Sequence, residues 1–473
     1  MESEERSGLQ ASLKGRHMTM ISLGGVIGAG LFVGSGAVMN STGPAAFLSY
    51  LAAGALVVLV MRMLGEMAVA NPAIGSFVEY TRRAIGPWAG FTTGWLYWWF
   101  WAIVLAIEAV AGATIIHGWL PSLPVWTISL LVMLLLTATN LYSVSSFGEF
   151  EFWFASIKVA AIIVFIAISA GFLLGIGSGG SPGLSNLTDH GGFAPKGGLT
   201  ILSGVVVVVF AFVGAEIVTI AAAESEEPER SVAKATNQVV ARVLVFYVLA
   251  VFLMLCVVPW NSTKLGESPF ATALDTIGIP GAADIMNAIV VTAVLSCLNS
   301  GIYVASRMLF ALARRGDAPK SLLDVNARGV PVKAILLSVS VGFVSVIFNA
   351  ISPDKVFLFL VNASGAVALF VYLLICVAQL RTRRRLEAEA PERLKLKMWL
   401  FPYLTYATMA AMVAVIVSVG LVKDTRSQLI PSLISLVVVL VAAYVVSRRA
   451  GREDLKAERP GGETGAFVRR SVS

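Results

Sequence analysis

The fold of this chain is decided by the stretch Gly24-Gly25-Val26-Ile27-Gly28-Ala29-Gly30, which lies in an apolar block over residues 18–40. Four glycines among these seven residues disfavour a continuous helix, because each glycine in a helix interior costs about 1 kcal/mol relative to alanine. A second apolar block, residues 199–222, contains the run Phe210-Ala211-Phe212-Val213-Gly214-Ala215-Glu216. Both blocks are therefore predicted to be interrupted helices, and close helix–helix packing through small residues is the alternative explanation of the glycines.

The composition places both interruptions in a membrane protein. Of the 473 residues, 57% are hydrophobic and 13% are charged, against about 25% charged residues in soluble domains. The apolar residues come in blocks of about twenty, which is the length of a helix that crosses the bilayer, whereas barrel strands are shorter and alternate. We therefore expect an all-α integral membrane protein with twelve transmembrane helices, at residues 18–40, 46–70, 90–117, 124–142, 151–175, 199–222, 236–258, 284–312, 332–350, 355–379, 399–421 and 429–447.

The basic residues indicate the orientation of these helices. Twenty-nine of the 35 lysines and arginines lie in the two tails and in the segments around the inner ends of the second, sixth, eighth and tenth blocks. Five lie in the loops of the opposite side, and Lys158 lies inside a block. Since basic residues concentrate on the cytoplasmic side, both termini are predicted to be cytoplasmic. The net charge of +7 is then a signal of topology, and we expect the lipid bilayer rather than a nucleic acid as the surrounding partner.

The chain is predicted to form one membrane domain, residues 18–447, between cytoplasmic tails at residues 1–17 and 448–473. It contains no GxxxxGK[ST] phosphate-binding loop, no metal-ligand spacing of His and Cys, and no recognisable pair of nucleophile and base. We therefore expect no enzymatic activity, no metal and no cofactor. The sequence does not indicate an oligomeric state.

Paired interruptions in corresponding helices are typical of transporters that are built from inverted repeats and bind their substrate between the repeats. A break exposes backbone N–H and C=O groups, and a zwitterion offers partners to both. We expect the amides of Gly28, Ala29 and Gly30 to bind a carboxylate, and the carbonyls near Val26, Phe210 and Val213 to bind an ammonium group. The predicted substrate site comprises Val26, Ile27, Gly28, Ala29, Gly30, Phe210, Val213 and Gly214, with Glu108 as a further candidate.

Four ionisable residues inside the apolar blocks are functional candidates, because charge in the membrane is costly. Glu108 is predicted to bind the substrate ammonium or a proton, or to form a protonated hydrogen bond between helices. Lys158 is predicted to gain and lose a proton during transport, or to extend to the cytoplasmic interface. Glu216 is predicted to organise the second interruption or to take part in gating. Glu66 is predicted to be structural, with Arg62 as a candidate partner.

The motifs resemble those of a known family. Gly25-Val26-Ile27-Gly28-Ala29-Gly30-Leu31-Phe32 resembles the first-helix signature of the amino acid–polyamine–organocation superfamily. The run from Gly214 to Ser225, followed by Glu227-Pro228-Glu229, is similar to the sixth-helix signature of its bacterial amino acid transporter family. The runs Trp95–Trp101, Glu149–Trp153 and Ser296-Cys297-Leu298-Asn299-Ser300 make the chain most similar to the 4-aminobutyrate (GABA) permeases.

This resemblance implies a five-plus-five inverted repeat, over residues 18–175 and 199–379, with two further helices at residues 399–447. It also implies proton symport in a bacterial cytoplasmic membrane, driven by the proton gradient. Lys158 matches a helix-five lysine that replaces a sodium ion in relatives, and Ser156 lies close to it in sequence. Ala29 departs from relatives that have Ser or Thr at this position, so its side chain offers no hydroxyl to a substrate carboxylate.

The sequence therefore predicts a proton-coupled symporter that imports GABA or a similar small zwitterionic amino acid by alternating access. The alternatives are a permease of the same fold for aromatic, basic or branched amino acids, and a channel or a transporter-like sensor. Concentrative, saturable uptake distinguishes a transporter from a channel.

Overall fold

The structure is a computed structural model that describes residues 27–71, 77–142, 147–176, 182–216, 228–262 and 268–457. Every regular element in these ranges is helical. Ten helices of the described chain are long and apolar enough to cross a membrane. They are α4 (Ala46–Ala70), α6 (Pro87–Trp119), α7 (Val125–Tyr142), α8 (Phe147–Leu173), the continuous run of α11 (Pro228–Arg242), η4 (Val243–Leu249) and α12 (Ala250–Val257), α14 (Ala282–Arg314), α15 (Val332–Ile351), α16 (Pro353–Glu389), α17 (Tyr403–Leu421) and α18 (Lys423–Ala457).

Two of these helices continue beyond the predicted apolar blocks. The prediction ends one of them at residue 379, but α16 runs on to Glu389, and α18 runs on past residue 447 to Ala457. In α16, ion pairs between side chains four residues apart support the extension: Arg383 with Glu387 at 2.8 Å, and Arg385 with Glu389 at 2.7 Å. Hydropathy alone does not predict such an extension, because pairs at this spacing stabilise a helix in water.

The two remaining predicted blocks contain short helices. The first contains α2 (Ala29–Phe32) and α3 (Gly34–Thr42), which are separated by Val33. The second contains α9 (Gly198–Phe210), after which residues 211–214 form a turn. Residues 18–26 and 217–222 of these blocks lie outside the described ranges.

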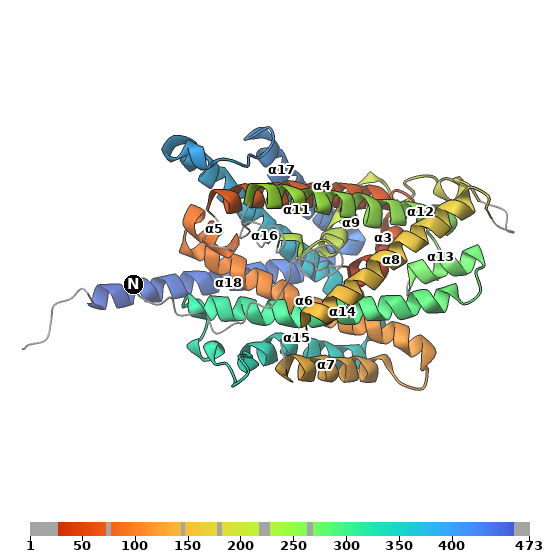
Figure 1. The fold of residues 1–473 in the computed structure, drawn as a ribbon, viewed down its shortest axis with the longest axis horizontal. Coiled ribbons are helices and arrows are strands. Elements are labelled where there is room, and N and C mark those ends of the chain that lie inside the picture. The colour runs from red at the N-terminus through yellow and green to blue at the C-terminus, as the bar shows by residue number, and fades with distance from the viewer. Residues whose placement is uncertain are drawn as a thin grey trace, which may run out of the picture.

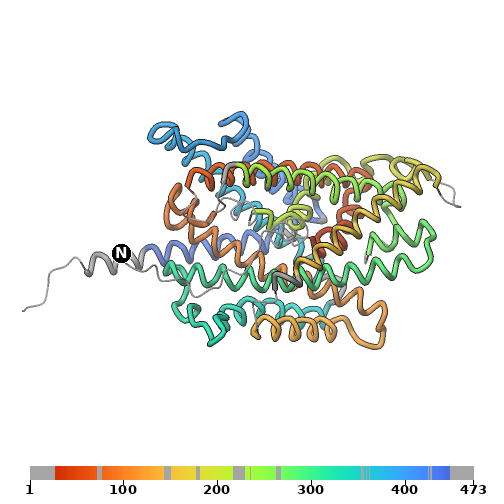
Figure 2. The backbone as a smooth tube through the Cα atoms, viewed as in Figure 1, coloured from red at the N-terminus to blue at the C-terminus, as the bar shows by residue number. Residues whose placement is uncertain are grey.

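The helices of the two halves of the chain interleave. Figure 2 shows α14 and α15 running alongside α6 and α7, which they contact. Two short helices lie at opposite ends of the bundle: α5 (Phe77–Ile85) at one end and α13 (Pro269–Ile277) at the other, as Figure 1 shows. The end that carries α5 also carries the charged end of α16.

Burial separates the central helices from the peripheral ones. In α6, 83% of the apolar span is buried inside the protein, whereas in α18 the share is 11%. Apolar side chains such as Ile434, Val438 and Val441 on α18 are more than half exposed, which suits a surface that faces lipid. Helix α6 therefore forms the centre of the bundle, and the residues that it presents to its neighbours are candidates for the site.

Helices α9 and α16 approach each other closely. A Cβ atom built on Gly365 of α16 would lie 2.0 Å from the carbonyl oxygen of Val206 on α9. Only glycine fits at this crossing, since no side chain has room between the two backbones. The close contact holds the end of α9, and the turn after it, against the core.

Candidate functional site

A small cavity lies where α2, α6, α14 and the turn after α9 meet. Its volume of about 10 Å³ is room for about one water molecule. Its lining mixes backbone, aromatic and ionisable groups: Gly30, Phe100, Trp101, Val104, Glu108, Phe210, Ala211, Val213 and Cys297. Gly30, Glu108, Phe210 and Val213, which the sequence predicted for the substrate site, thus lie around one cavity.

Glu108 is bound to the beginning of α2. The backbone N–H of Ala29 donates to both carboxylate oxygens of Glu108, at 3.1 and 3.0 Å, and the contact is buried. A Cβ atom on Gly28 would lie 2.5 Å from Glu108 Oε1 and 2.8 Å from Cys297 Cβ. Gly28 therefore leaves the space in which the carboxylate reaches the amide. A carboxylate thus already occupies the position that the sequence predicted for the carboxylate of a ligand.

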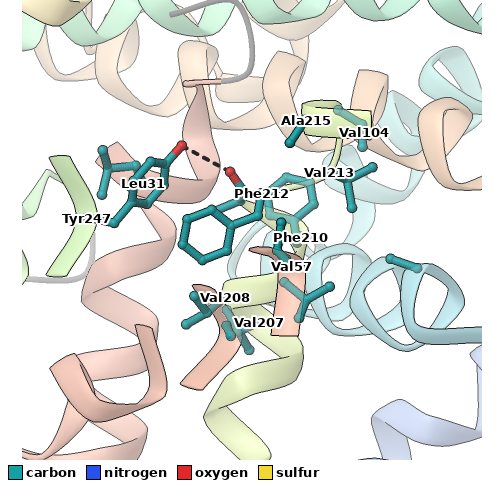
Figure 3. Packing of buried hydrophobic residues seen from close by; sticks show 14 of the residues in the cluster. Leu31, Val57, Val104, Val207, Val208, Phe210, Phe212, Val213, Ala215 and Tyr247 are labelled. Atoms are coloured by element: carbon teal, nitrogen blue, oxygen red, sulfur yellow. Dashed lines mark hydrogen bonds between the residues drawn. The ribbon is translucent and has the colours of Figure 1, made fainter. Parts of the chain in front are cut away.

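The last residue of α9 and the turn after it line the cavity with Phe210, Ala211 and Val213. Within the part of the chain that the structure describes, no hydrogen bond is found to the carbonyl oxygens of Phe210 and Val213. The neighbouring carbonyl of Ala211 accepts a hydrogen bond from the Tyr247 hydroxyl at 3.1 Å. Figure 3 shows this bond as a dashed line, with the ring of Phe212 beside that of Tyr247. The carbonyls of Phe210 and Val213 are therefore candidate acceptors for an ammonium group.

Glu216 holds the turn that follows α9. Its Oε1 accepts the backbone N–H of Gly214 at 3.0 Å, and its Oε2 accepts the hydroxyl of Tyr372 on α16 at 3.2 Å. Gly214 has a φ of 108°, a conformation that favours glycine. The carboxylate thus connects the turn to α16, a geometry that is compatible with both predicted roles, organising the interruption and gating.

Lys158 is completely buried between α8 and α14. Its Nζ donates to Ser296 Oγ at 3.0 Å and lies 3.8 Å from Glu151 Oε1. The Ser296 hydroxyl in turn donates to Glu151 Oε2 at 2.7 Å. The predicted neighbour Ser156 instead donates to the carbonyl of Phe152 in its own helix, at 2.8 Å. Lys158 therefore has a carboxylate and a hydroxyl as partners, and neither was among the predicted site residues.

Glu66 forms a buried junction of α4, α16 and the segment before α17. It accepts hydrogen bonds from Gln379 Nε2 and Arg383 NH1, each at 2.8 Å, and from the backbone N–H of Met398. The predicted partner Arg62 instead donates to the carbonyl of Lys397, at 3.0 and 2.9 Å. Glu66 thus forms a buried ion pair with Arg383, which is more than 300 residues away in the sequence. The predicted partner, Arg62, is only one helical turn away.

A second group of ion pairs joins α5 to the segment after α14. Arg82 pairs with Asp317, and Arg315 lies 3.7 Å from Glu79. The indole N–H of Trp95 donates to the Asp317 carbonyl at 3.0 Å. Burial raises the pKa of Asp317 above its ordinary value, although Arg82 acts in the opposite direction. This group closes the bundle at the end that carries α5.

The structure brings some of the predicted residues to the cavity and places others elsewhere. Ile27 is completely buried and Lys158 lies outside the cavity lining. Val26 lies outside the described residues. The residues that sequence reasoning missed are Glu151, Ser296, Cys297, Phe100, Trp101, Tyr247 and Tyr372. Five of these stand in runs that carried the family resemblance, which was the available signal: Phe100, Trp101, Glu151, Ser296 and Cys297.

No group of three or more His, Cys, Asp or Glu side chains that could hold a metal ion occurs among the described residues. The lining of the cavity offers backbone groups, one carboxylate, one thiol and aromatic rings. Such an arrangement can bind a small charged molecule by hydrogen bonds. The rings of Phe100 and Phe210 contact each other, with 6.1 Å between their centroids, and so cover the cavity on one side.

Comparison with known proteins identifies the family. Residues 17–453 match the family model described as amino acid permease. The chain is 53% identical to the gamma-aminobutyric acid permease of Bacillus subtilis (strain 168), over 97% of this chain and 98% of the relative. It is 47% identical to a probable GABA permease of Pseudomonas aeruginosa, over 96% of each chain, and 48% identical to the gamma-aminobutyric acid permease of Escherichia coli (strain K12), over 88% of this chain and 90% of the relative.

These relatives are named as transporters and not as enzymes, which agrees with the ten apolar helices and confirms the resemblance noted in the sequence. The protein is a multi-pass membrane transporter that belongs to the amino acid permease family.

Proposed function

We propose that this amino acid permease is a proton-coupled symporter that imports GABA, or a similarly small zwitterionic amino acid, across the bacterial cytoplasmic membrane. Support for the substrate comes from three relatives that are 47–53% identical and are named as permeases or probable permeases of this compound. The chemistry around the cavity also suits a zwitterion, because the Glu108 carboxyl group is a partner for an ammonium group and the backbone amide of Gly30 is a partner for a carboxylate.

The observation that carries the proposal is the contact of Glu108 with Ala29 beside the carbonyls of Phe210 and Val213. The substrate ammonium group binds the Glu108 carboxylate and these carbonyls. The substrate carboxylate then takes the amide of Ala29, and that of Gly30 next to it, as Glu108 turns toward the ammonium group. Because GABA separates its two charges by three methylene groups, one molecule spans from one set of partners to the other.

Transport requires the cavity to change size. About 10 Å³ holds one water molecule but no amino acid, so the rings of Phe100, Trp101 and Phe210 have to separate when substrate enters. We assign α2 with α3, and α9 with the turn after it, to the interrupted first and sixth helices of a twelve-helix, five-plus-five inverted repeat with cytoplasmic termini. Relative motion of the two repeats then opens the cavity to each side of the membrane in turn.

Glu216 is suited to take part in this motion. Its carboxylate joins the turn after α9 to Tyr372 on α16, so opening between these two elements must break the bond to Tyr372. A carboxylate that holds a closed arrangement through one breakable hydrogen bond can serve as a gate. In the same scheme Glu66 stays a structural residue.

The coupling proton binds at Lys158. The side chain of Lys158 is 0% exposed and its Nζ contacts Ser296 and Glu151, so movement of α8 against α14 changes the surroundings of its ammonium group directly. If protonation and substrate binding favour the same conformation, each strengthens the other. The proton gradient then serves as the energy source, and no cofactor is required.

The test is uptake of radiolabelled GABA into proteoliposomes with an imposed pH gradient, acid outside. The parent protein is expected to accumulate GABA, to lose accumulation with a protonophore, and to be indifferent to replacement of sodium by choline. Lys158→Ala is expected to make uptake independent of the pH gradient. The coupling assignment is overturned if uptake by this variant still collapses with the protonophore as in the parent. Stronger competition by aromatic, basic or branched amino acids than by unlabelled GABA would overturn the substrate assignment.

A further inference from the structure

Three buried side chains form a continuous chain of hydrogen bonds between α8 and α14. Lys158 Nζ donates to Ser296 Oγ at 3.0 Å, and Ser296 Oγ donates to Glu151 Oε2 at 2.7 Å. The side chains of Lys158 and Glu151 are 0% and 1% exposed. Each donor in this chain points the same way, from the ammonium group through the hydroxyl to the carboxylate. This is the arrangement that a proton needs to move along hydrogen bonds.

The electrostatics of the pair favour transfer over simple loss of a proton. Lys158 and Glu151 together carry no net charge when both are ionised, and Glu151 Oε1 lies 3.8 Å from Nζ. If Lys158 lost its proton to bulk solvent, Glu151 would become an isolated buried carboxylate, a state that is costly. If the proton instead moves to Glu151, both groups become neutral at the same moment.

We propose that Glu151 is the acceptor of the coupling proton, which it receives from Lys158 through the hydroxyl of Ser296. In this step an N–H bond of the Lys158 ammonium group breaks and an O–H bond forms on Ser296 Oγ. The original O–H bond of Ser296 breaks, and an O–H bond forms on the Glu151 carboxylate. The products are a neutral amine, an unchanged serine and a neutral carboxylic acid. The inference rests on the proposed proton symport and adds the route by which the proton leaves.

The position of Glu151 along α8 indicates the direction in which the proton moves. It precedes Lys158 by seven residues in the same helix, which is about 10 Å along the axis at 1.5 Å per residue. The orientation proposed from the basic residues places the beginning of α8 on the cytoplasmic side. The backbone of Glu151 therefore lies nearer to the cytoplasm than that of Lys158, on the side to which import delivers the proton, while their side chains meet at 3.8 Å.

Other titratable groups near the relay are accounted for by different contacts. Glu108 on α6 and Cys297 on α14 both interact electrostatically with Lys158. Glu108, however, is hydrogen-bonded to Ala29 at the cavity. Cys297 lines that same cavity. Of these carboxylates, Glu151 is the one that the Ser296 hydroxyl joins to Lys158, and its Oε1 has no hydrogen-bond partner within the described chain.

The test compares two kinds of GABA transport in proteoliposomes. Net uptake driven by a pH gradient requires release of the proton inside, whereas exchange of labelled for unlabelled GABA proceeds with the proton still bound. Glu151→Gln keeps an oxygen acceptor for Ser296 but cannot take a proton. We expect its exchange to stay within about twofold of the parent, and its gradient-driven uptake to fall by about 100-fold, the usual effect of removing a proton-transfer group.

Two further variants and a control sharpen the result. Ser296→Ala interrupts the relay and is expected to lower gradient-driven uptake while exchange persists. Glu151→Asp retains a carboxylate and is expected to restore part of the gradient-driven uptake. Ser169→Ala, which removes another buried hydroxyl of α8, is expected to leave both activities unchanged.

The outcomes separate this inference from the proposed function. Parent protein that ignores the pH gradient overturns proton symport and the relay together. A coupled parent with full gradient-driven uptake by Glu151→Gln overturns the relay alone. Equal loss of exchange and net uptake in Glu151→Gln and Ser296→Ala, with unchanged melting temperature, points to a structural role and also overturns the relay. If Glu151→Gln does not fold, Glu151→Asp and Ser296→Ala decide by the same comparison.

Discussion

The carboxylate of Glu108 and the backbone amide of Ala29 meet through two hydrogen bonds, across 79 positions of the sequence. The contact joins the central helix α6 to the beginning of α2. It also places one negative charge in the wall of the cavity, beside carbonyl groups of the turn after α9. In the proposed function, this carboxylate of the protein binds the ammonium group of the substrate.

Replacement of Glu108 by glutamine is expected to raise the KM for GABA by about tenfold or more. The amide keeps the shape of the side chain and can still accept the Ala29 N–H, but it removes the charge opposite the substrate ammonium group. Hydrogen bonds to charged groups contribute about 1.5–3 kcal/mol. Initial rates of uptake over a range of GABA concentrations measure the effect, and Glu389→Gln, at an exposed carboxylate, serves as the control. An unchanged KM would remove Glu108 from the substrate site.

Gly28→Ala is expected to abolish most transport without preventing expression. The added Cβ atom would lie 2.5 Å from Glu108 Oε1 and 2.9 Å from Cys297 Sγ, so the contact of Glu108 with Ala29 must be displaced. The matched control is Gly118→Ala, because a Cβ atom there meets nothing within 4 Å. Binding of GABA to purified protein, measured by calorimetry, should be lost in the first variant and kept in the second. Equal binding by both variants would contradict this account of Gly28.

Arg383→Ala is expected to destabilise the protein strongly, because it leaves the Glu66 carboxylate buried without its cation. Breaking one side of a buried ion pair costs about 3–5 kcal/mol. The control lies two residues further along α16: Arg385 and Glu389 are 70% and 60% exposed, and an exposed pair contributes at most about 1 kcal/mol. Thermal unfolding in detergent should separate Arg383→Ala from Arg385→Ala clearly. Similar melting temperatures for the two variants would show that Glu66 does not depend on this partner.

Tyr247→Phe is expected to lower stability by about 1–3 kcal/mol, the cost of leaving a buried acceptor without its donor. The lost bond is the one that the hydroxyl donates to the Ala211 carbonyl at 3.1 Å. Tyr50→Phe is the matched control, since the Tyr50 hydroxyl is buried without a hydrogen-bond partner in the described chain and its removal should be neutral or stabilising. Melting temperatures of the two variants, measured side by side, check this difference, and a reversed order would refute it.

Asp317→Asn is expected to alter stability in a pH-dependent way. Burial raises the folded-state pKa of Asp317, so ionisation costs more free energy in the folded state than in the unfolded state. The favourable contribution of the protonated form is present at low pH and is lost as the pH rises through the folded pKa. The variant should therefore match the parent at about pH 4 and should melt at a higher temperature than the parent at pH 7. A variant less stable than the parent at pH 7 would mean that the ion pair with Arg82 outweighs burial.

The sequence predicted the membrane-spanning helices well, because a helix that crosses the hydrocarbon core has to be apolar along its length and is therefore visible as an apolar block. All ten apolar helices of the described chain coincide with predicted blocks, apart from extensions such as that of α16 to Glu389. The extension was missed because its residues are charged and its support comes from side-chain pairs in water. Glu108 lines the same cavity as Gly30, Phe210 and Val213, and its predicted role in binding an ammonium group or a proton stays a prediction.

The partners of the buried charges could not be predicted in the same way. Glu151 is the first residue of its predicted apolar block. A charged residue at that position is interpreted as part of the polar segment that flanks the helix. Ser296 is a small polar residue in an apolar helix, and nothing local distinguishes it from a serine that bonds to its own backbone, as Ser156 does. Pairing across helices depends on how the helices pack, and local sequence patterns carry little of that information.

The junction at Glu66 has a consequence for how the protein is made. The carboxylate on α4 precedes its partner Arg383 by 317 residues, which a ribosome takes about 15–60 s to add at ~5–20 residues per second. During that interval α4 enters the membrane with a carboxylate that has no arginine to meet. The pair forms only when the chain is nearly finished, so a truncated product that ends before α16 lacks it. Closure of this contact therefore marks synthesis through α16, and a chain that ends earlier keeps the Glu66 carboxylate in the membrane without its arginine.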